Sequence, residues 1–209
     1  MSYYNSKYFQ WQQKAGELAG KANLFFYKSF IGINDNVLDF GCGGGYLLSQ
    51  IQCKSKLGIE INEEARKHAS MNGVKTMEKT YHCSNDWADV IISCHALEHT
   101  FDPLSELKNL YPKLKVNGKI IFVVPYERKV HYKPNDVNQH LFTWSEMNLA
   151  NLFTCAGYKV LQVKEFHHRF LPSSAFIMKY FGIKGFHFVS RIYGFFSRDI
   201  TQIRVIAAK

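Results

Sequence analysis

Short apolar runs alternate with amphipathic segments along the middle of the chain. The apolar runs have the length of buried strands and cover residues 36–40, 56–61, 74–78, 89–94 and 117–125. The segments between them predict helices over 46–53, 62–72, 102–114 and 145–157. Three of these helices begin at residues that commonly cap helix N-termini, namely Asn62, Asp102 and Ser145. Because regular alternation favours a mostly parallel sheet with helices on both faces, the pattern predicts a doubly wound α/β fold.

The two ends of the chain extend this core. Residues 6–29 are rich in aromatic side chains, lysine and glutamine and predict an N-terminal helical segment. Strands over 158–166 and 201–209 bring the predicted sheet to seven strands, and a long insert separates these two. We expect one domain over 1–209, made of an N-terminal helical segment (1–34), a core (35–166), a helical insert (167–200) and the last strand (201–209).

Composition indicates a globular protein and its expected cellular compartment. With 46% hydrophobic and 21% charged residues, the chain resembles ordinary globular proteins. No uncharged apolar run approaches the roughly 18–20 residues that a membrane span needs, and the first residues lack the apolar region of a signal peptide. The five cysteines include no C-x-x-C pair, so we expect neither a disulfide framework nor a thiolate metal site. A cytoplasmic protein is expected.

The net charge of +9 is concentrated near the C-terminus. Residues 1–160 carry 18 Lys and Arg against 15 Asp and Glu, a surplus of 3, whereas residues 161–209 carry 8 against 2, a surplus of 6. The insert is also aromatic, and glycines at 182 and 185 are expected to interrupt a helix there. Three interpretations stay open: a helical lid over a substrate pocket, a surface for a membrane or a lipid-linked substrate, and an RNA contact without a module signature.

A glycine cluster follows the first predicted strand, where parallel sheets bind ligands. Three alternate glycines let the backbone turn tightly and approach a ligand: Gly41, Gly43 and Gly45. The dinucleotide fingerprint would need another glycine where Tyr46 stands, which disfavours a pyrophosphate. Asp39 before the cluster suits a cationic ligand, and Glu60 at the next strand end can accept bonds from ribose hydroxyls. The predicted ligand has a ribose and a positive charge.

Four segments carry a family resemblance. VLDFGCGGG, GIEIN, DVIISCHALEHTFDP and LKVNGKIIFVVP resemble motifs of the class I S-adenosylmethionine-dependent methyltransferases, in the bacterial subgroup with an H-x-L-E-H segment after strand four. The resemblance covers roughly residues 35–165 and implies a Rossmann-like methyltransferase fold, with S-adenosylmethionine as cofactor. The turn before strand five departs from the family pattern, since Val116 and Asn117 stand where proline and glycine are usual.

The resemblance also implies roles for single residues in binding the cofactor. Asp39 would lie near the amino end of the methionine moiety, against which the glycine loop packs. Glu60 would hold the ribose hydroxyls, and Ile61 would pack on the adenine. Ser93 would offer its backbone carbonyl to the methionine amino group. Met77 stands where the family lines the adenine pocket.

The segment SCHALEHTF contains H-x-x-E-H, which on one helix would be a zinc signature. It directly follows an apolar strand, and the next helix begins only at Asp102, so we expect a connection or one short turn and no metal site. His95, nearest the strand end, is then the candidate that accepts a proton from the methyl acceptor. His131 and His140, on the loop 126–144 after strand five, are the other candidates. A zinc hydrolase remains a remote alternative.

The absence of two motifs narrows the range of expected methyl acceptors. The N/D-P-P-Y/F segment of amino-group methylases is missing, and so is the Pro-Cys pair of cytosine-C5 enzymes, which makes Cys94 a small buried residue. We therefore expect methyl transfer to oxygen of a small-molecule, sugar or lipid-linked acceptor. The alternative is an RNA methyltransferase, or a module that binds RNA or membranes. Near the N-terminus, Tyr8, Phe9 and Trp11 either face the cofactor or pack against the sheet edge.

Overall fold

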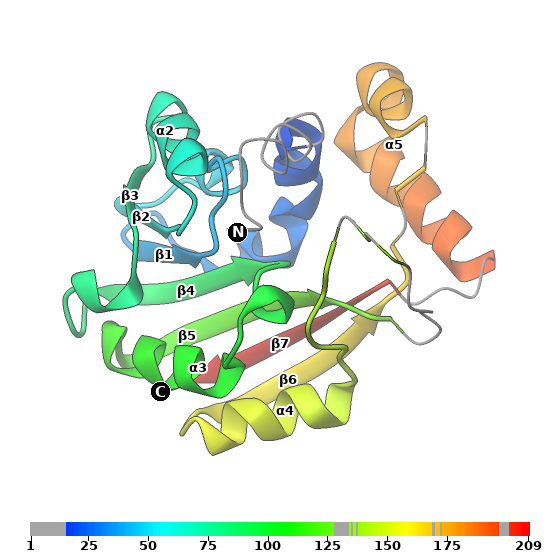
Figure 1. Ribbon diagram of the computed structural model, residues 1–209. Coiled ribbons are helices and arrows are strands. Elements are labelled where there is room, and N and C mark those ends of the chain that lie inside the picture. Colours follow the sequence, from blue (N-terminus) through cyan, green and yellow to red (C-terminus); the bar gives the residue numbers. More distant parts are fainter. Residues whose placement is uncertain are drawn as a thin grey trace.

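The computed structural model describes residues 16–127, 134, 136, 138–168, 170–171, 173–196 and 201–209. A seven-stranded sheet forms the centre, in the order β3-β2-β1-β4-β5-β7-β6 (Figure 1). The strands are β1 (Asn36–Phe40), β2 (Ser55–Ile59), β3 (Lys75–Met77), β4 (Ala88–Cys94), β5 (Leu114–Pro125), β6 (Lys159–Phe166) and β7 (Gln202–Ala208). The first five run parallel, and β7 lies antiparallel between β5 and β6. The predicted doubly wound, seven-stranded fold is confirmed.

The predicted helix starts are confirmed at their caps. The helices are α2 (Glu63–Met71), α3 (Pro103–Leu110), α4 (Glu146–Cys155) and α5 (Ser174–Phe196), and residues 16–23 are also helical. The side chains of Asn62, Asp102 and Ser145 each accept a hydrogen bond from a backbone N–H in the first turn of the helix that follows. The helix predicted over 46–53 is wrong: only one 3-10 turn forms there, Leu48–Gln50.

The sheet separates two hydrophobic cores. Neighbouring residues of a strand face opposite sides, so Ile120 of β5 enters one core and Ile121 the other. Leu107 of α3 and Phe153 of α4 fill the first core. Phe26, from the N-terminal segment, belongs to the second core. The helices therefore cover both faces of the sheet.

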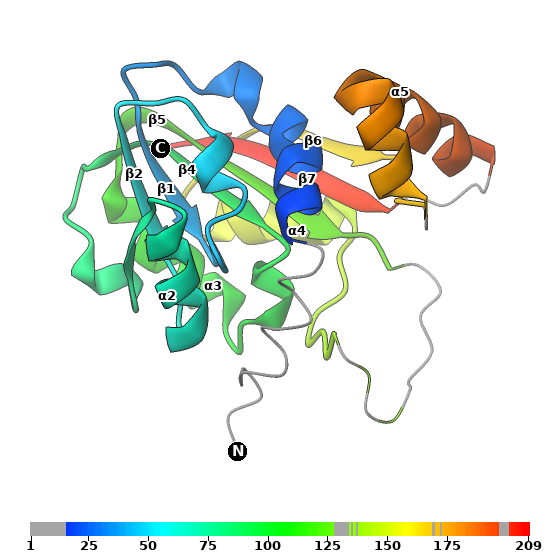
Figure 2. The same cartoon turned by 90° about the horizontal axis from the view of Figure 1, so that it is seen from above.

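The insert before β7 is helical, as predicted. Helix α5 bends at Gly182, whose φ of 65° lies in the left-handed region that favours glycine. Gly185 does not interrupt the helix. The helix lies beside the N-terminal helix and near the ends of β6 and β7 (Figures 1 and 2), and Phe25 and His187 join the two with ring centroids 4.7 Å apart. Among the described residues, no helix has the length and apolar character to cross a membrane.

Two glycines let the N-terminal helix pack closely on the segment after the glycine loop. Gly16 and Gly20 lie four residues apart and therefore share one helix face. A Cβ on Gly16 would collide with the Tyr46 ring, and a Cβ on Gly20 would collide with the backbone carbonyl of Tyr46. Small side chains at these positions are therefore what allows the helix to cover the loop.

Replacing Gly20 with alanine should destabilise the protein. Alanine is better than glycine in a helix by about 1 kcal/mol, but overpacking against fixed backbone costs about 1–3 kcal/mol. We expect urea denaturation to show a lower free energy of unfolding than in the wild type. Gly32→Ala is the control, because its Cβ would meet the Asp35 carboxylate at an ordinary 3.5 Å. Equal stability of the two variants would contradict the close packing.

Candidate active site

The glycine loop joins β1 to the site in a conformation that needs glycine. Gly41, Gly43 and Gly45 have φ values of 73°, 53° and 74°, all in the left-handed region. The backbone N–H groups of Gly41 and Cys42 donate to the Ile59 carbonyl, which ties the loop to the end of β2. At Gly43 an added Cβ would meet nothing within 4 Å. The loop therefore presents open backbone, the cradle that a ligand needs.

Glu60 connects the two strand ends through its carboxylate. Oε2 accepts a hydrogen bond from the Gly43 N–H at 2.9 Å, and Oε1 accepts one from the Asn62 N–H at 2.8 Å. Burial raises the pKa of Glu60 even though these bonds act in the opposite direction. Each carboxylate oxygen retains a lone pair, so Glu60 can still accept bonds from a diol.

Asp39, on β1 before the glycine loop, is the more deeply buried of the two acids. Its residue is 2% exposed, and no described donor hydrogen-bonds to its carboxylate. Burial raises the pKa of Asp39 well above its usual range, and the charge of Glu60 adds to the shift. A buried acid beside a second, half-buried acid is costly, so this place favours a positively charged ligand.

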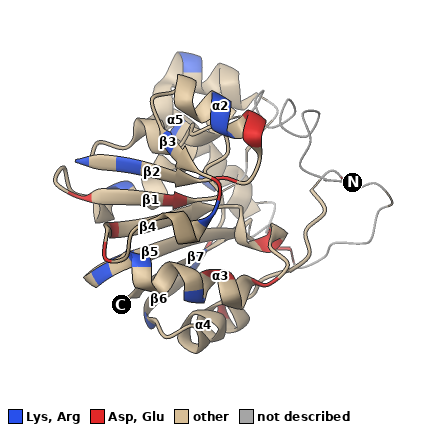
Figure 3. Ribbon diagram, turned by 60° about the vertical axis from the view of Figure 1, so that its left-hand side comes forward, with Lys and Arg blue, Asp and Glu red and all other residues tan. Residues whose placement is uncertain are grey.

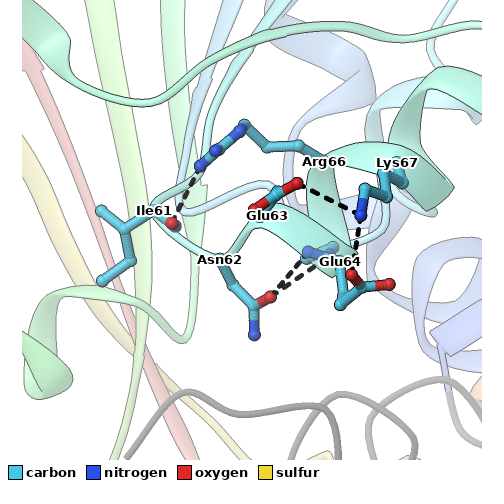
Figure 4. A network of polar contacts seen from close by, with 7 residues as sticks. Ile61, Asn62, Glu63, Glu64, Arg66 and Lys67 are labelled. Atoms are coloured by element: carbon cyan, nitrogen blue, oxygen red, sulfur yellow. Dashed lines mark hydrogen bonds and ion pairs between the residues drawn. The ribbon is translucent and has the colours of Figure 1, made fainter. Parts of the chain in front are cut away.

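The loop after Glu60 exposes an apolar side chain beside these acids. Ile61 is 58% exposed although it is a large aliphatic residue. Figure 4 shows how the surrounding polar groups hold the loop: Asn62 caps α2, and Arg66 donates to the Ile61 carbonyl at 2.8 Å. Met77 ends β3 next to it, and its carbonyl accepts the Glu60 N–H at 2.9 Å. Ile61 and Met77 thus lie near the end of β2, where Glu60 stands.

Ser93 is buried, and its carbonyl is already engaged. The hydroxyl of Tyr27 donates to the Ser93 carbonyl at 2.7 Å, and Ser93 Oγ donates to the Phe40 carbonyl at 2.8 Å. That the Ser93 carbonyl also accepts a bond from the methionine amino group stays a prediction. The sequence carried no motif that pointed to Tyr27, because this contact spans 66 residues.

The H-x-x-E-H segment forms a short turn, as predicted, and no zinc-binding helix. His95 has a φ of 55°, and the only helical element is one 3-10 turn, Leu97–His99. His95 Nδ1 lies 3.5 Å from Oε1 of Glu98, which is fully buried. The Cβ that Gly41 lacks would collide with Ala96, so this turn packs against the glycine loop.

His140 reaches the same turn from the loop after β5. Its ring centroid lies 4.8 Å from that of His99, and its Nδ1 is 2.8 Å from Oε1 of Glu127. The Leu141 N–H donates to the Glu98 carbonyl at 2.9 Å. Burial is the main cause that lowers the pKa of His99, which keeps its ring neutral at pH 7. His131, and with it Tyr8, Phe9 and Trp11, lies outside the described residues.

A pocket of about 340 Å³ opens beside His95. Four parts of the chain meet there, namely the N-terminal helix, the turn after β4, the segment after β6 and the start of β7. Its lining residues are Ala19, Asn23, His95, His168, Phe170, Thr201 and Gln202. Among these described residues, His95 is the one predicted site residue, and a single sequence offers no local signal for the others.

His168 gives the pocket a neutral wall. Its Nε2 lies 3.0 Å from Nδ1 of His187 on α5. Burial, and then the charges of His187 and Arg191, lower the pKa of His168 to about 4, so it is uncharged at neutral pH. Cys94 is equally inert, because desolvation raises the pKa of its thiol to about 12. Cys94 was predicted to be buried; it is half-buried and packs against the second core.

Comparisons with known proteins identify the class. A family model described as a methyltransferase domain matches residues 7–163. A ubiquinone biosynthesis O-methyltransferase of Actinobacillus pleuropneumoniae serotype 5b is 33% identical over 128 residues, which cover 53% of this chain and 48% of that protein. The Vibrio cholerae serotype O1 protein of that name is 32% identical over 114 residues, covering 49% and 44%. The chain thus spans about half the length of the curated relatives it matches.

Solved structures share the fold. An S-adenosylmethionine-dependent methyltransferase of Archaeoglobus fulgidus has a TM-score of 0.67 at 20% identity, covering 97% of this chain and 99% of that one. Haemonchus contortus phosphoethanolamine N-methyltransferase 2, solved with S-adenosylmethionine, has a TM-score of 0.62 at 15% identity, covering 90% and 52%.

The chain belongs to the methyltransferase-domain family, whose model spans most of it. The methyltransferase family predicted from the sequence is confirmed.

Proposed function

We propose that the protein transfers a methyl group from S-adenosylmethionine to a hydroxyl oxygen of a small, lipid-linked acceptor. The observation that carries the proposal is the position of His95, which lines the 340 Å³ pocket directly after β4. The turn that holds His95 also packs on the glycine loop, through Ala96 and Gly41. A proton acceptor, an acceptor pocket and a cofactor cradle therefore adjoin one another.

The residues of the cradle fit the cofactor in charge and shape. The Asp39 carboxyl is buried, the half-buried Glu60 carboxylate lies close to it, and S-adenosylmethionine carries an ammonium and a sulfonium charge. Glu60 would accept bonds from the ribose hydroxyls, Gly43 would admit the ligand to the backbone, and Ile61 would pack on the adenine. The bound cofactor supplies an electrophilic methyl group.

His95 would orient the acceptor and take its proton. The Nδ1 atom faces Glu98 at 3.5 Å, which leaves Nε2 for a substrate hydroxyl. Such a group is needed for a hydroxyl, because an alcohol or phenol must lose its proton as the methyl group arrives. The ubiquinone biosynthesis O-methyltransferases among the relatives support oxygen as the acceptor atom.

The exposed apolar side chains of helix α5 support the proposal that the acceptor is lipid-linked and reaches the protein from a membrane surface. Nine of the eighteen large hydrophobic residues that are exposed in the described structure lie on this helix, among them Phe181, Phe188 and Phe195. We call this set the α5 surface: Phe176, Tyr180, Phe181, Ile183, Phe188, Ile192, Tyr193, Phe195 and Phe196.

The charges of α5 favour anionic lipid as the partner. The helix contains Lys179, Lys184 and Arg191 and no acidic residue. Basic residues on an aromatic surface suit an anionic lipid headgroup region. The view in Figure 3 shows Lys and Arg scattered over many elements, whereas nucleic-acid sites gather them in one field.

Asp39→Asn should separate cofactor binding from stability. The amide cannot offset the cofactor's charge, so the thermal stabilisation by S-adenosylmethionine, about 2.7 kcal/mol at 100 times the wild-type dissociation constant, should largely disappear. Without ligand the variant should be more stable by about 1 kcal/mol, because a buried charge is removed. Differential scanning fluorimetry and urea denaturation measure the two effects. Asp86→Asn, at an exposed acid, is the control, and full stabilisation of Asp39→Asn would exclude the proposed cradle.

His95→Gln should slow methyl transfer without weakening cofactor binding. General bases typically contribute about 10²–10⁴-fold, so we expect a fall of at least about 100-fold in kcat. The assay follows transfer of a labelled methyl group to a panel of phenols and catechols with and without a prenyl chain. The dissociation constant of S-adenosylmethionine is measured by calorimetry in parallel. Wild-type turnover in His95→Gln would remove His95 from the chemistry.

Membrane binding should depend on the α5 surface. We expect the protein to float with vesicles that contain phosphatidylglycerol and much less with pure phosphatidylcholine vesicles. The double variant Phe181→Ser, Phe188→Ser should bind the phosphatidylglycerol vesicles at least about 10-fold more weakly, because burial of apolar side chains drives insertion. Met147→Ser on α4, also exposed, should bind like the wild type. Unchanged flotation of the double variant, or a loss of RNA retention in its place, would refute the lipid contact.

A further inference from the structure

Three side chains near His95 form a cluster that the cofactor site does not use. Glu98 and His99 come from the turn Leu97–His99, and His140 comes from the loop between β5 and α4. One ligand atom of each lies within 4.8 Å of the others. The histidines at the two ends of H-x-x-E-H do not form this group. In a zinc signature on a single helix, His95 would be the second histidine ligand. Here His140, which is distant in sequence, occupies that role in the cluster.

Glu98 is the residue of the cluster whose carboxyl group most needs a cation or a hydrogen-bond donor. The residue is completely buried, and neither carboxylate oxygen has a hydrogen-bond partner among the described residues. The nearest cationic candidate is His95 Nδ1 at 3.5 Å, beyond ordinary hydrogen-bond length. A buried carboxylate without hydrogen bonds costs several kcal/mol unless a cation compensates it. The cluster thus places a buried carboxyl group without described hydrogen bonds close to two imidazoles.

The surroundings hold His140 as metal-binding histidines are held. Its Nδ1 lies 2.8 Å from the Glu127 carboxylate, which fixes the ring and leaves Nε2 for a ligand. A carboxylate on the second nitrogen is the usual partner of a histidine that binds zinc. The bond from the Leu141 N–H to the Glu98 carbonyl brings the loop and the turn together.

We propose that Glu98, His99 and His140 bind one divalent transition-metal ion of the zinc class. Two imidazoles and one carboxylate are a known zinc ligand set with a fourth position left for water or a substrate oxygen. Ligand bonds of about 2.0–2.2 Å place tetrahedral donor atoms about 3.3–3.5 Å apart, so the widest separation in the cluster, up to 4.8 Å, must shrink by up to about 1.5 Å on binding. Magnesium, which prefers oxygen ligands, fits this set poorly.

The ion would hold together two segments on the side of the protein where the methyl acceptor is proposed to bind. It would join the loop after β5 to the turn that carries His95, and it would compensate the charge of Glu98. The cofactor cradle of Asp39 and Glu60 contains none of the three ligands. Metal binding is therefore independent of cofactor binding and can be tested without an acceptor.

The test is a zinc titration of the whole chain after removal of metal with a chelator. Competition with a chromophoric zinc indicator gives the affinity, and atomic emission after dialysis gives the stoichiometry. We expect one zinc ion per chain and a rise in Tm with zinc but not with an equal concentration of magnesium. His140→Ala and Glu98→Gln should weaken zinc binding at least about 100-fold, and Glu127→Gln should weaken it about 10–100-fold as an outer partner.

The matched control is His82→Ala, which removes an exposed histidine outside the cluster and should keep wild-type zinc affinity. His140→Ala should also keep the stabilisation by S-adenosylmethionine, which shows that the variant is folded and that cofactor binding is intact. Should Glu98→Gln fail to fold, His140→Ala still decides the matter. Zinc uptake below one ion per chain, or equal affinity in His140→Ala and His82→Ala, overturns the proposal.

Discussion

The close placement of two carboxylates, the buried Asp39 and the half-buried Glu60, is the constraint on which the rest of the site depends. Parallel strands β1 and β2 end side by side, so an acid at each end must share one small volume. The folded chain keeps Glu60 in place with two backbone N–H donors but gives Asp39 no described donor at all. The energy that this arrangement costs without ligand is recovered when a cationic ligand enters, so electrostatics selects the cofactor.

Covering the site requires the chain ends to approach the glycine loop closely. Glycines at 16 and 20 let the N-terminal helix contact Tyr46, and the same segment sends Tyr27 to the Ser93 carbonyl. The pocket wall is then completed from the other end of the chain, by Thr201 and Gln202. Sheet order explains this meeting, since β7 lies beside β5 and brings the C-terminal strand next to the centre.

Local sequence determined the strands, the three helix caps and the glycine loop, because each depends on neighbours within a few residues. It failed at residues 46–53, where the apolar pattern of a helix was satisfied by packing one 3-10 turn and extended chain into the second core. It also could not predict His168 beside His187, or His140 beside His99. Those pairs are made by the path of a long loop and of an insert, which no periodicity within a strand or helix records.

The insert links the pocket to the surface of the protein in one element. Phe186 is fully buried and its ring packs on His168, whereas Phe188, two residues on, is 66% exposed on the α5 surface. The bend at Gly182 separates the first half of α5 from the half that carries both residues. A helix fixed at the pocket by Phe186 cannot be placed on a membrane without placing the pocket there too. For a lipid-linked acceptor this geometry shortens the path from the bilayer to His95, which a lid made only of polar loop would not do.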